Sequence, residues 1–157
     1  MISLPIHRIR WHAALFPKGQ SRITPIRVGA WRDGPMEVVS GAVGKQRVHF
    51  VAPAADRLAG EMSTFLNWFH AESTMDPVMK AAQAHLWFVT IHPFDDGNGR
   101  LARAISDMAL ARPEESPQRF YSMSTQVRLE RDGYYEALEN AQRGTADVTR
   151  WMGRKPR

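Results

Sequence analysis

The segment from Val78 to Ile91 constrains the fold most, because it is almost wholly apolar and long enough for about four turns of helix. It follows Asp76 and Pro77, residue types that are typical of the N-cap and the first position of a helix. A helix that is apolar on every face is buried. The segment therefore predicts a central helix around which the rest of the chain packs.

The stretch after this helix, from His92 to Arg103, reads His-Pro-Phe-Asp-Asp-Gly-Asn-Gly-Arg-Leu-Ala-Arg. We call it the motif. Apolar residues then recur at helical spacing until Pro113 interrupts the pattern. The motif is thus predicted to join two helices, with Gly97 to Arg100 at the N-terminus of the second.

The start of this second helix is typical of an anion site, because the first N–H groups of a helix lack partners and lie at the positive end of its dipole. Gly97 and Gly99, on either side of Asn98, permit positive φ and close approach of a ligand. Arg100 and Arg103 project from neighbouring points on the first turns. Two forked cations beside such a site suit a polyphosphate better than a single carboxylate.

Two further residues of the motif add chemistry to the predicted phosphate site. Asp96 offers a hard oxygen ligand for Mg²⁺ shared with the polyphosphate. His92 is the one side chain of the set that accepts a proton near neutral pH without unusual tuning, so it is the candidate general base. Taken singly, each residue would fit a polar turn or a solvated helix face, but their joint occurrence favours a functional site.

The motif resembles the whole signature of the Fic (filamentation induced by cAMP) family, His-Pro-Phe-x-Asp/Glu-Gly-Asn-Gly-Arg-x-x-Arg, with every defined position filled. The similarity extends from about Trp11 to about Trp151. It implies a mainly α fold, a Fic-type helical bundle around a central helix-loop-helix, with one β-hairpin flap. A P-loop or Rossmann site is argued against, because the Walker lysine and serine are missing and no strand precedes the glycines.

The resemblance also implies an activity, a protein adenylyltransferase that moves AMP from ATP, with Mg²⁺, onto a Ser, Thr or Tyr hydroxyl of a target protein. His92 would take the proton of the attacking hydroxyl, and Asp96 would hold the metal. Arg100 and Arg103 would bind the β- and γ-phosphates, while Gly97, Asn98 and Gly99 line the anion hole. Phe94 would point into the core, and Tyr135 and Gln142 would contact adenine.

Two kinds of protein partner follow from the same resemblance. A hairpin is predicted between Val28 and Phe50 from alternating apolar residues and a glycine-containing turn. In the family the matching flap, residues 38–50 here, holds the target as an added strand, but a purely structural hairpin fits the sequence equally well. An inhibitory Ser/Thr-x-x-x-Glu-Gly/Asn helix is missing from the sequence, and Glu139-Asn140 is only a look-alike. Either the chain is a fragment of a longer self-inhibited protein, or a small partner supplies a glutamate in trans to Arg103.

The remaining elements are predicted from apolar spacing and helix breakers. Helices are expected over Arg10–Phe16, Pro53–His70, Gln118–Leu129, Arg131–Arg143 and Ala146–Met152, with a loop over Gln20–Arg27. His85, inside the apolar helix, is interpreted as a hydrogen-bonded core histidine. Residues 1–152 are predicted to form a single Fic-like domain, followed by a basic, disordered tail over residues 153–157.

Composition limits the other classes. The chain has 157 residues, 43% of them hydrophobic and 24% charged, which is typical of one globular domain. The absence of cysteine excludes disulfides and thiolate chemistry, and no membrane span or signal peptide is recognisable, so a soluble cytoplasmic protein is expected. The net charge of +5 is concentrated near both ends, but no nucleic-acid-binding motif accompanies it.

Three functional hypotheses stay open at this point. The first is the adenylyltransferase. The second is a related transferase that uses another nucleotide, or a phosphotransferase, although Gly99 in place of lysine argues against the phosphotransferase. The third is a catalytically idle regulatory or nucleic-acid-binding module, which only the basic residues near the two ends of the chain support.

Overall fold

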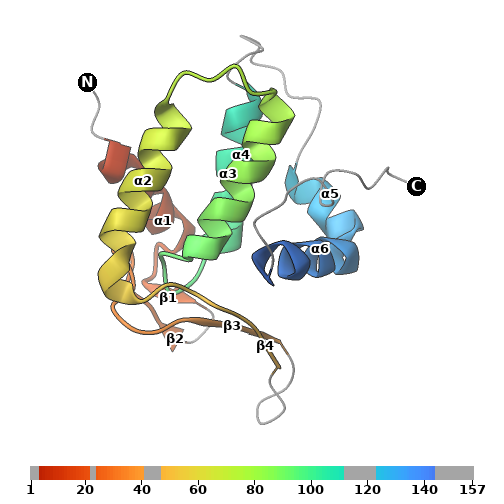
Figure 1. Ribbon diagram of the computed structural model, residues 1–157. Helices are drawn as coiled ribbons and strands as arrows, with labels where there is room; N and C mark the ends of the chain where they lie inside the picture. Colours follow the sequence, from red (N-terminus) through yellow and green to blue (C-terminus); the bar gives the residue numbers. More distant parts are fainter. Residues whose placement is uncertain (1–3, 22–23, 41–46, 112–122, 144–157) are drawn as a thin grey trace.

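The structure is a computed structural model that describes residues 4–21, 24–40, 47–111 and 123–143. This part contains six α-helices, one short 3₁₀ turn and two small antiparallel hairpins (Figure 1). In chain order the elements are α1 (Leu4–Leu15), β1 (Gln20–Ser21), β2 (Thr24–Pro25), β3 (Glu37–Ser40), β4 (Arg47–Val51), η1 (Ala55–Arg57), α2 (Leu58–His70), α3 (Pro77–Ile91), α4 (Asn98–Ala111), α5 (Met123–Leu129) and α6 (Arg131–Arg143). The predicted mainly α fold with a central helix pair is confirmed.

Helices α3 and α4 form that pair and lie side by side at the centre of the molecule (Figure 1). The carboxylate of Asp76 accepts hydrogen bonds from the N–H groups of Val78 (2.9 Å) and Met79 (3.2 Å), so it caps α3 as predicted. Most of α3 is buried, but Val78 in its first turn is 57% exposed. The expectation of a helix buried on every face is therefore wrong for this first turn.

The main core lies between α2, α3 and α4. Helix α2 contributes one apolar stripe, as its helical spacing predicts, and its rings of Phe65 and Phe69 are fully buried. Phe88 of α3 packs against Phe65 at 5.9 Å between ring centroids. This core holds the two ends of the motif at fixed positions.

The N-terminal region differs from the prediction in two ways. Helix α1 begins at Leu4 rather than Arg10, since Pro5 is compatible with a first helical turn. The predicted loop over Gln20–Arg27 contains the hairpin of β1 and β2, in which Gln20 pairs with Pro25. Strands of two residues are too short to show alternation, so the pattern could not reveal them.

The hairpin of β3 and β4 is the predicted flap. Its strands pair Glu37 with Val51 and Ser40 with Arg47, with a bulge next to Val38 and Val39. The flap extends from the helical body toward α6 (Figure 1). Glu139 of α6 joins it there, through bonds of 2.8 Å to both Arg47 and His49. Helix α6 therefore contacts the flap through the carboxylate of Glu139, the residue that resembles the glutamate of the inhibitory helix.

One buried position in α3 is polar and behaves as predicted. His85 is fully buried, and its Nε2 atom lies 2.7 Å from the hydroxyl of Tyr134 in α6, while Ser106 of α4 contacts Nδ1 at 3.3 Å. Burial lowers the pKa of His85 to about 4. His85 is a hydrogen-bonded core histidine that ties α3 to two neighbours.

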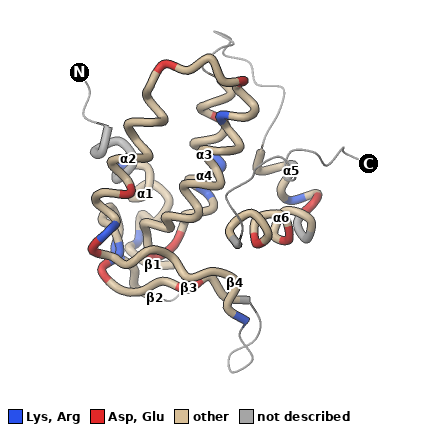
Figure 2. The backbone as a smooth tube through the Cα atoms, in the orientation of Figure 1, with Lys and Arg blue, Asp and Glu red and all other residues tan. Residues whose placement is uncertain are grey.

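Several predictions fall outside the described residues, namely the helix over Ala146–Met152, the tail over residues 153–157 and the first part of the helix predicted from Gln118. Within the described part, none of the helices is both long enough and apolar enough to cross a bilayer. Basic and acidic positions are interspersed along the described backbone (Figure 2).

Candidate active site

His92 ends α3 in an unusual backbone conformation. It is the C-cap, with φ 50° and ψ 59°, and no other non-glycine residue in the described part has positive φ. Its Nδ1 atom lies 2.9 Å from the carbonyl oxygen of Val89, so Nδ1 carries the proton and donates it, and Nε2 keeps its lone pair. The geometry therefore presents Nε2 of His92 as a proton acceptor.

The electrostatic surroundings also keep this imidazole neutral. Burial is the largest effect and lowers the pKa of His92 below its ordinary value, and the nearby charge of Arg32 acts in the same direction. The hydrogen bond to Val89 and the charge of Asp96 oppose this shift without cancelling it. Near neutral pH, His92 is thus deprotonated and can act as a base.

Phe94 and Asn98 close the loop between α3 and α4. The side chain of Asn98 accepts a bond from the N–H of Phe94 (3.0 Å) and donates one to its carbonyl oxygen (2.7 Å). Phe94 is 1% exposed, which confirms that it points into the core. Asn98 therefore fixes the loop with its side chain, while its backbone N–H belongs to the first turn of α4.

His12 of α1 contacts this loop from the N-terminal part of the chain. It is fully buried, and its ring stacks on Phe94 at 4.1 Å between centroids. Nδ1 accepts a bond from the N–H of Gly29 (3.0 Å), so Nε2 carries the proton and donates to the carbonyl oxygen of Asp96 (3.0 Å). Burial lowers the pKa of His12, which favours this neutral form.

The carboxylate of Asp96 is held on both oxygens. Oδ1 accepts a 2.5 Å bond from the N–H of Gly97, and Oδ2 accepts one from the hydroxyl of Ser21 in β1. Burial raises the pKa of Asp96, but these two bonds and the cation of Arg100, 3.9 Å away, outweigh it and lower the pKa overall. Asp96 is thus an ionised carboxylate at neutral pH.

This carboxylate fits the requirements for Mg²⁺ bound together with a nucleotide. Magnesium usually keeps several waters and is held by one or two carboxylates plus phosphate oxygens, so a dedicated protein cage is not needed. The described residues contain no group of three or more acidic or histidine side chains that could form such a cage. Asp96 is partly exposed and charged, so it could supply the one protein ligand that a shared ion requires.

Gly97 and Gly99 occupy different environments at the predicted anion hole. Gly97 has φ 83°, which an L-residue rarely adopts, whereas Gly99 lies inside the first turn of α4. The N–H groups of this first turn have no partners within the helix, so they can face an anion. The structure therefore places Gly97, Asn98 and Gly99 where phosphate binding was predicted.

The two arginines of the motif leave α4 toward different neighbours. The guanidinium of Arg100 lies 4.5 Å from the ring centroid of Phe16, and 44% of its side chain is exposed. Arg103 donates from Nε to the hydroxyl of Ser124 in α5, at 3.2 Å. Both cations remain near the start of α4, where they could reach an anion bound at its N-terminus.

The two residues predicted to contact adenine lie on α6. Tyr135 is 53% exposed and packs edge-on against Tyr134, at 5.1 Å between centroids. The amide of Gln142 donates to the hydroxyl of Thr90 in α3, at 3.4 Å. Gln142 thus contacts the last turn of α3 through Thr90, two residues before His92 in the chain, and the side chain of Tyr135 is about half exposed.

Several residues that contact the motif were not identified from the sequence. Three of them are His12, Ser21 and Arg32, which hold the motif from α1, β1 and the segment before β3. Each is an isolated polar residue with no recognisable spacing to the motif. The sequence offered no signal for them, and Arg32 with the adjacent Asp33 has the appearance of an ordinary exposed charge pair.

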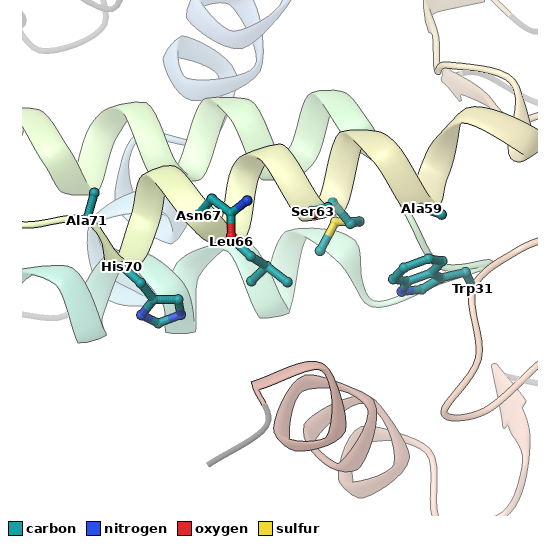
Figure 3. Close-up of a pocket in the computed structure, with 8 residues that line it drawn as sticks. Trp31, Ala59, Ser63, Leu66, Asn67, His70 and Ala71 are labelled. Carbon is teal, nitrogen blue, oxygen red and sulfur yellow. The ribbon is translucent and has the colours of Figure 1, made fainter. Parts of the chain in front are cut away.

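A pocket of about 540 Å³ lies elsewhere, along α2 (Figure 3). It extends from Trp31 at one end to His70 and Ala71 at the other, with Leu66 and Asn67 between them (Figure 3). No residue of the motif lines it. This pocket is therefore separate from the candidate site at the motif.

Known proteins resemble this chain in sequence. A protein adenylyltransferase fic-1 of Caenorhabditis briggsae is 33% identical over 113 residues, which cover 71% of this chain and 20% of that protein. A uridine 5'-monophosphate transferase of Xanthomonas campestris pv. campestris (strain 8004) is 40% identical over 67 residues, 38% of this chain and 12% of that protein. The chain thus spans about a fifth or less of the length of these curated relatives.

The fold matches as well. The crystal structure of a Fic family protein from Desulfovibrio desulfuricans G20 superposes with a TM-score of 0.74 at 27% identity, over 94% of this chain and 42% of that chain. The sequence profile of the Fic/DOC family matches residues 5–110, which include α1, the flap and the whole motif. The chain belongs to the Fic/DOC family.

Proposed function

We propose that this protein is a protein adenylyltransferase, which transfers AMP from ATP to a hydroxyl group of a target protein. The observation that carries the proposal is the state of His92, whose Nδ1–H is committed to Val89 and whose Nε2 is left as an acceptor. This base lies in the same short loop as a helix N-terminus suited to phosphates. The names of the adenylyltransferase relatives support the choice of reaction.

In the proposed step, the hydroxyl oxygen of the target attacks the α-phosphorus of ATP. Its proton moves to Nε2 of His92, a new P–O bond forms to the target, and the bond between the α-phosphorus and the bridging oxygen breaks. Pyrophosphate leaves with the bonding electron pair. Little covalent work falls to the protein in such transfers, so positioning and charge stabilisation dominate.

The phosphates would be held by the start of α4. The N–H groups of Asn98 and Gly99 would face the phosphate oxygens, and Gly97 would allow close approach. Arg100 and Arg103 would bind the β- and γ-phosphates. Mg²⁺, when bound by Asp96 and the nucleotide, would neutralise phosphate charge.

The base of the nucleotide would bind against α6. Tyr135 would pack on adenine with its exposed ring, and Gln142 would bind its polar edge, from the same helix α6. The Xanthomonas campestris relative is named for uridine 5'-monophosphate transfer, so a uridine nucleotide is the second candidate. Competition among the four nucleoside triphosphates for labelled ATP would rank them.

Two protein partners are proposed. The target would add an extended segment to an edge of the flap, through backbone bonds to β3 or β4. A separate regulatory protein would supply a glutamate to Arg103, displacing its contact with Ser124 and blocking the γ-phosphate site. Without that partner, the chain would be active and would label itself on an exposed Ser, Thr or Tyr.

Transfer of label from α-labelled ATP to proteins of a cell lysate, with Mg²⁺, tests the proposal directly. The wild-type chain should label a target or itself, and label should stay with the protein after denaturation. ATP labelled at the γ-position should give no labelled protein, since pyrophosphate leaves. Label from γ-labelled ATP would instead indicate a phosphotransferase, and a folded protein that binds DNA with a steep salt dependence but no ATP would favour the idle module.

A further inference from the structure

Arg32 is a buried cation whose partners are all carbonyl groups. It is 3% exposed, and its Nε donates to the carbonyl oxygen of His92 at 2.8 Å. Nη1 donates to Gly34 (2.8 Å), and Nη2 donates to Pro53 (2.5 Å) and Ile91 (3.4 Å). Among the ion pairs of the described residues, none involves Arg32.

These carbonyl groups belong to two different parts of the protein. Ile91 and His92 form the end of α3, whereas Gly34 precedes β3 and Pro53 follows β4, at the two ends of the flap. The backbone N–H of Arg32 adds a bond of 2.9 Å to Pro93. One side chain thus joins the base of the flap to the loop that carries the proposed catalytic base.

The contact between Arg32 and His92 stabilises a strained backbone conformation. His92 has a left-handed backbone, which costs a non-glycine residue free energy and persists only where its surroundings impose it. Its imidazole is held at Val89, and its carbonyl oxygen is held by Arg32. The last carbonyl groups of a helix otherwise lack partners, so a buried end of α3 requires donors such as these.

We propose that Arg32 is a positioning residue, which fixes the flap and His92 in one arrangement so that an acceptor held by the flap meets the base. Arg32 would not touch the substrate. This inference rests on the proposed function for its catalytic consequence, but the joint between flap and loop can be measured without any activity.

The planar guanidinium is required for this joint, since five donors in a fork can reach carbonyl groups on opposite sides. A lysine would keep the charge but has one compact ammonium group, which cannot serve both segments. A methionine would fill much of the space with neither charge nor donors. The two substitutions therefore separate charge from geometry.

The first measurement is hydrogen exchange of the full-length variants Arg32→Lys and Arg32→Met, with Arg57→Met as the matched control. Arg57, the last residue of η1, is exposed and pairs with Glu61 of α2. The N–H of Ala52, which bonds to Met36 across the base of the flap at 2.9 Å, reports on the joint. Both Arg32 variants should exchange it at least about tenfold faster than wild type and control, with amides of α2 unchanged.

The second measurement is steady-state AMP transfer. Both Arg32 variants should lose about tenfold or more in kcat with an ATP dissociation constant within about twofold of wild type. Their pH profiles should differ, because Arg32 and Asp96 are the charged groups acting on His92. Arg32→Met removes a cation and should move the acid limb to higher pH, whereas Arg32→Lys should leave the limb in place.

The proposal would be overturned if the N–H of Ala52 exchanged at the wild-type rate in both Arg32 variants. It would also be overturned if Arg32→Lys showed faster exchange at Ala52 but kept the wild-type kcat. If Arg32→Met does not fold, the exchange rate at Ala52 and the kcat of Arg32→Lys still test the proposal. If the wild-type protein transfers no nucleotide at all, the proposed function fails, and the exchange data alone confirm or reject the joint.

Discussion

Gly97 lies directly against the ring of Phe16, so that a methyl group on its Cα would come within 2.9 Å of the Cε2 atom of Phe16. Phe16 is buried and cannot easily move. Gly97 also has φ 83°. Gly97→Ala should therefore lower the free energy of unfolding by at least about 2 kcal/mol, because backbone strain and overpacking each cost about 1–3 kcal/mol. Urea unfolding measures the change.

The neighbouring glycine is the matched control. A methyl group at Gly99 would lie 3.5 Å from Nη1 of Arg103, an ordinary contact. Gly99→Ala should keep or raise stability, by up to about 1 kcal/mol, since alanine is the better helix former. It should still weaken ATP binding, because the ligand loses close approach to the backbone. Equal destabilisation by both substitutions would contradict the distinction between the two glycines.

His92→Ala should abolish AMP transfer and leave ATP binding largely intact, since a general base contributes about 10²–10⁴-fold to the rate. Labelling with α-labelled ATP and calorimetric ATP binding measure the two effects. The melting temperature provides the control, because a purely structural histidine would lower stability instead. Wild-type labelling by the variant would remove His92 from the mechanism.

Arg100→Ala and Arg103→Ala should weaken ATP more than AMP, because AMP lacks the β- and γ-phosphates that these cations would bind. A hydrogen bond between charged groups is worth about 1.5–3 kcal/mol, which corresponds to about 10–150-fold in affinity. Isothermal titration with both nucleotides measures the ratio. Arg57→Ala, which removes an exposed cation at the end of η1, should change neither affinity. Equal weakening of ATP and AMP would reject the assignment to the distal phosphates.

Asp96→Asn should leave AMP binding nearly unchanged but raise the Mg²⁺ concentration needed for transfer, because the amide is a poorer ligand for a hard cation. A titration of the transfer rate with Mg²⁺ measures this requirement. Ser21→Ala, which removes one hydrogen bond to the same carboxylate, is the control and should shift the requirement less. An unchanged requirement in Asp96→Asn would exclude Asp96 as a metal ligand.

The fold should lose stability in mild acid. Burial lowers the pKa of His85 to about 4, so between pH 7 and 4 the unfolded chain takes up a proton that the folded protein does not. The free energy of unfolding therefore decreases as the pH falls from the unfolded pKa of about 6.5 to the folded pKa of about 4. His85 accounts for about 3 kcal/mol of this decrease. His85→Gln, which does not titrate, should be less stable at pH 7 yet show a shallower fall. An unchanged slope would mean that other groups cause the acid effect.

The sequence was sufficient for the local parts of the fold and site. The cap at Asp76 and Pro77, the central helix pair and the motif were predictable, because capping and apolar spacing act over a few residues. The contacts of Ser21 and Arg32 with the motif were not, because they depend on tertiary packing between segments far apart in the chain. The two-residue strands of β1 and β2 were missed for a related reason, since pairing rather than composition defines them.

The bond between His12 and Asp96 joins residues 84 positions apart, and that between Arg32 and His92 spans 60. Closing such long loops costs chain entropy before any contact offsets it, so long-range contacts slow folding. The pair of α3 and α4 needs only neighbouring residues and can form early. In a chain made from its N-terminus, α1 must wait for the motif to be synthesised, so the loop carrying His92 acquires its supports at the end of folding. A partly folded molecule then has the start of α4 in place without a fixed His92 beside it, so the proposed transfer would require the completely folded chain.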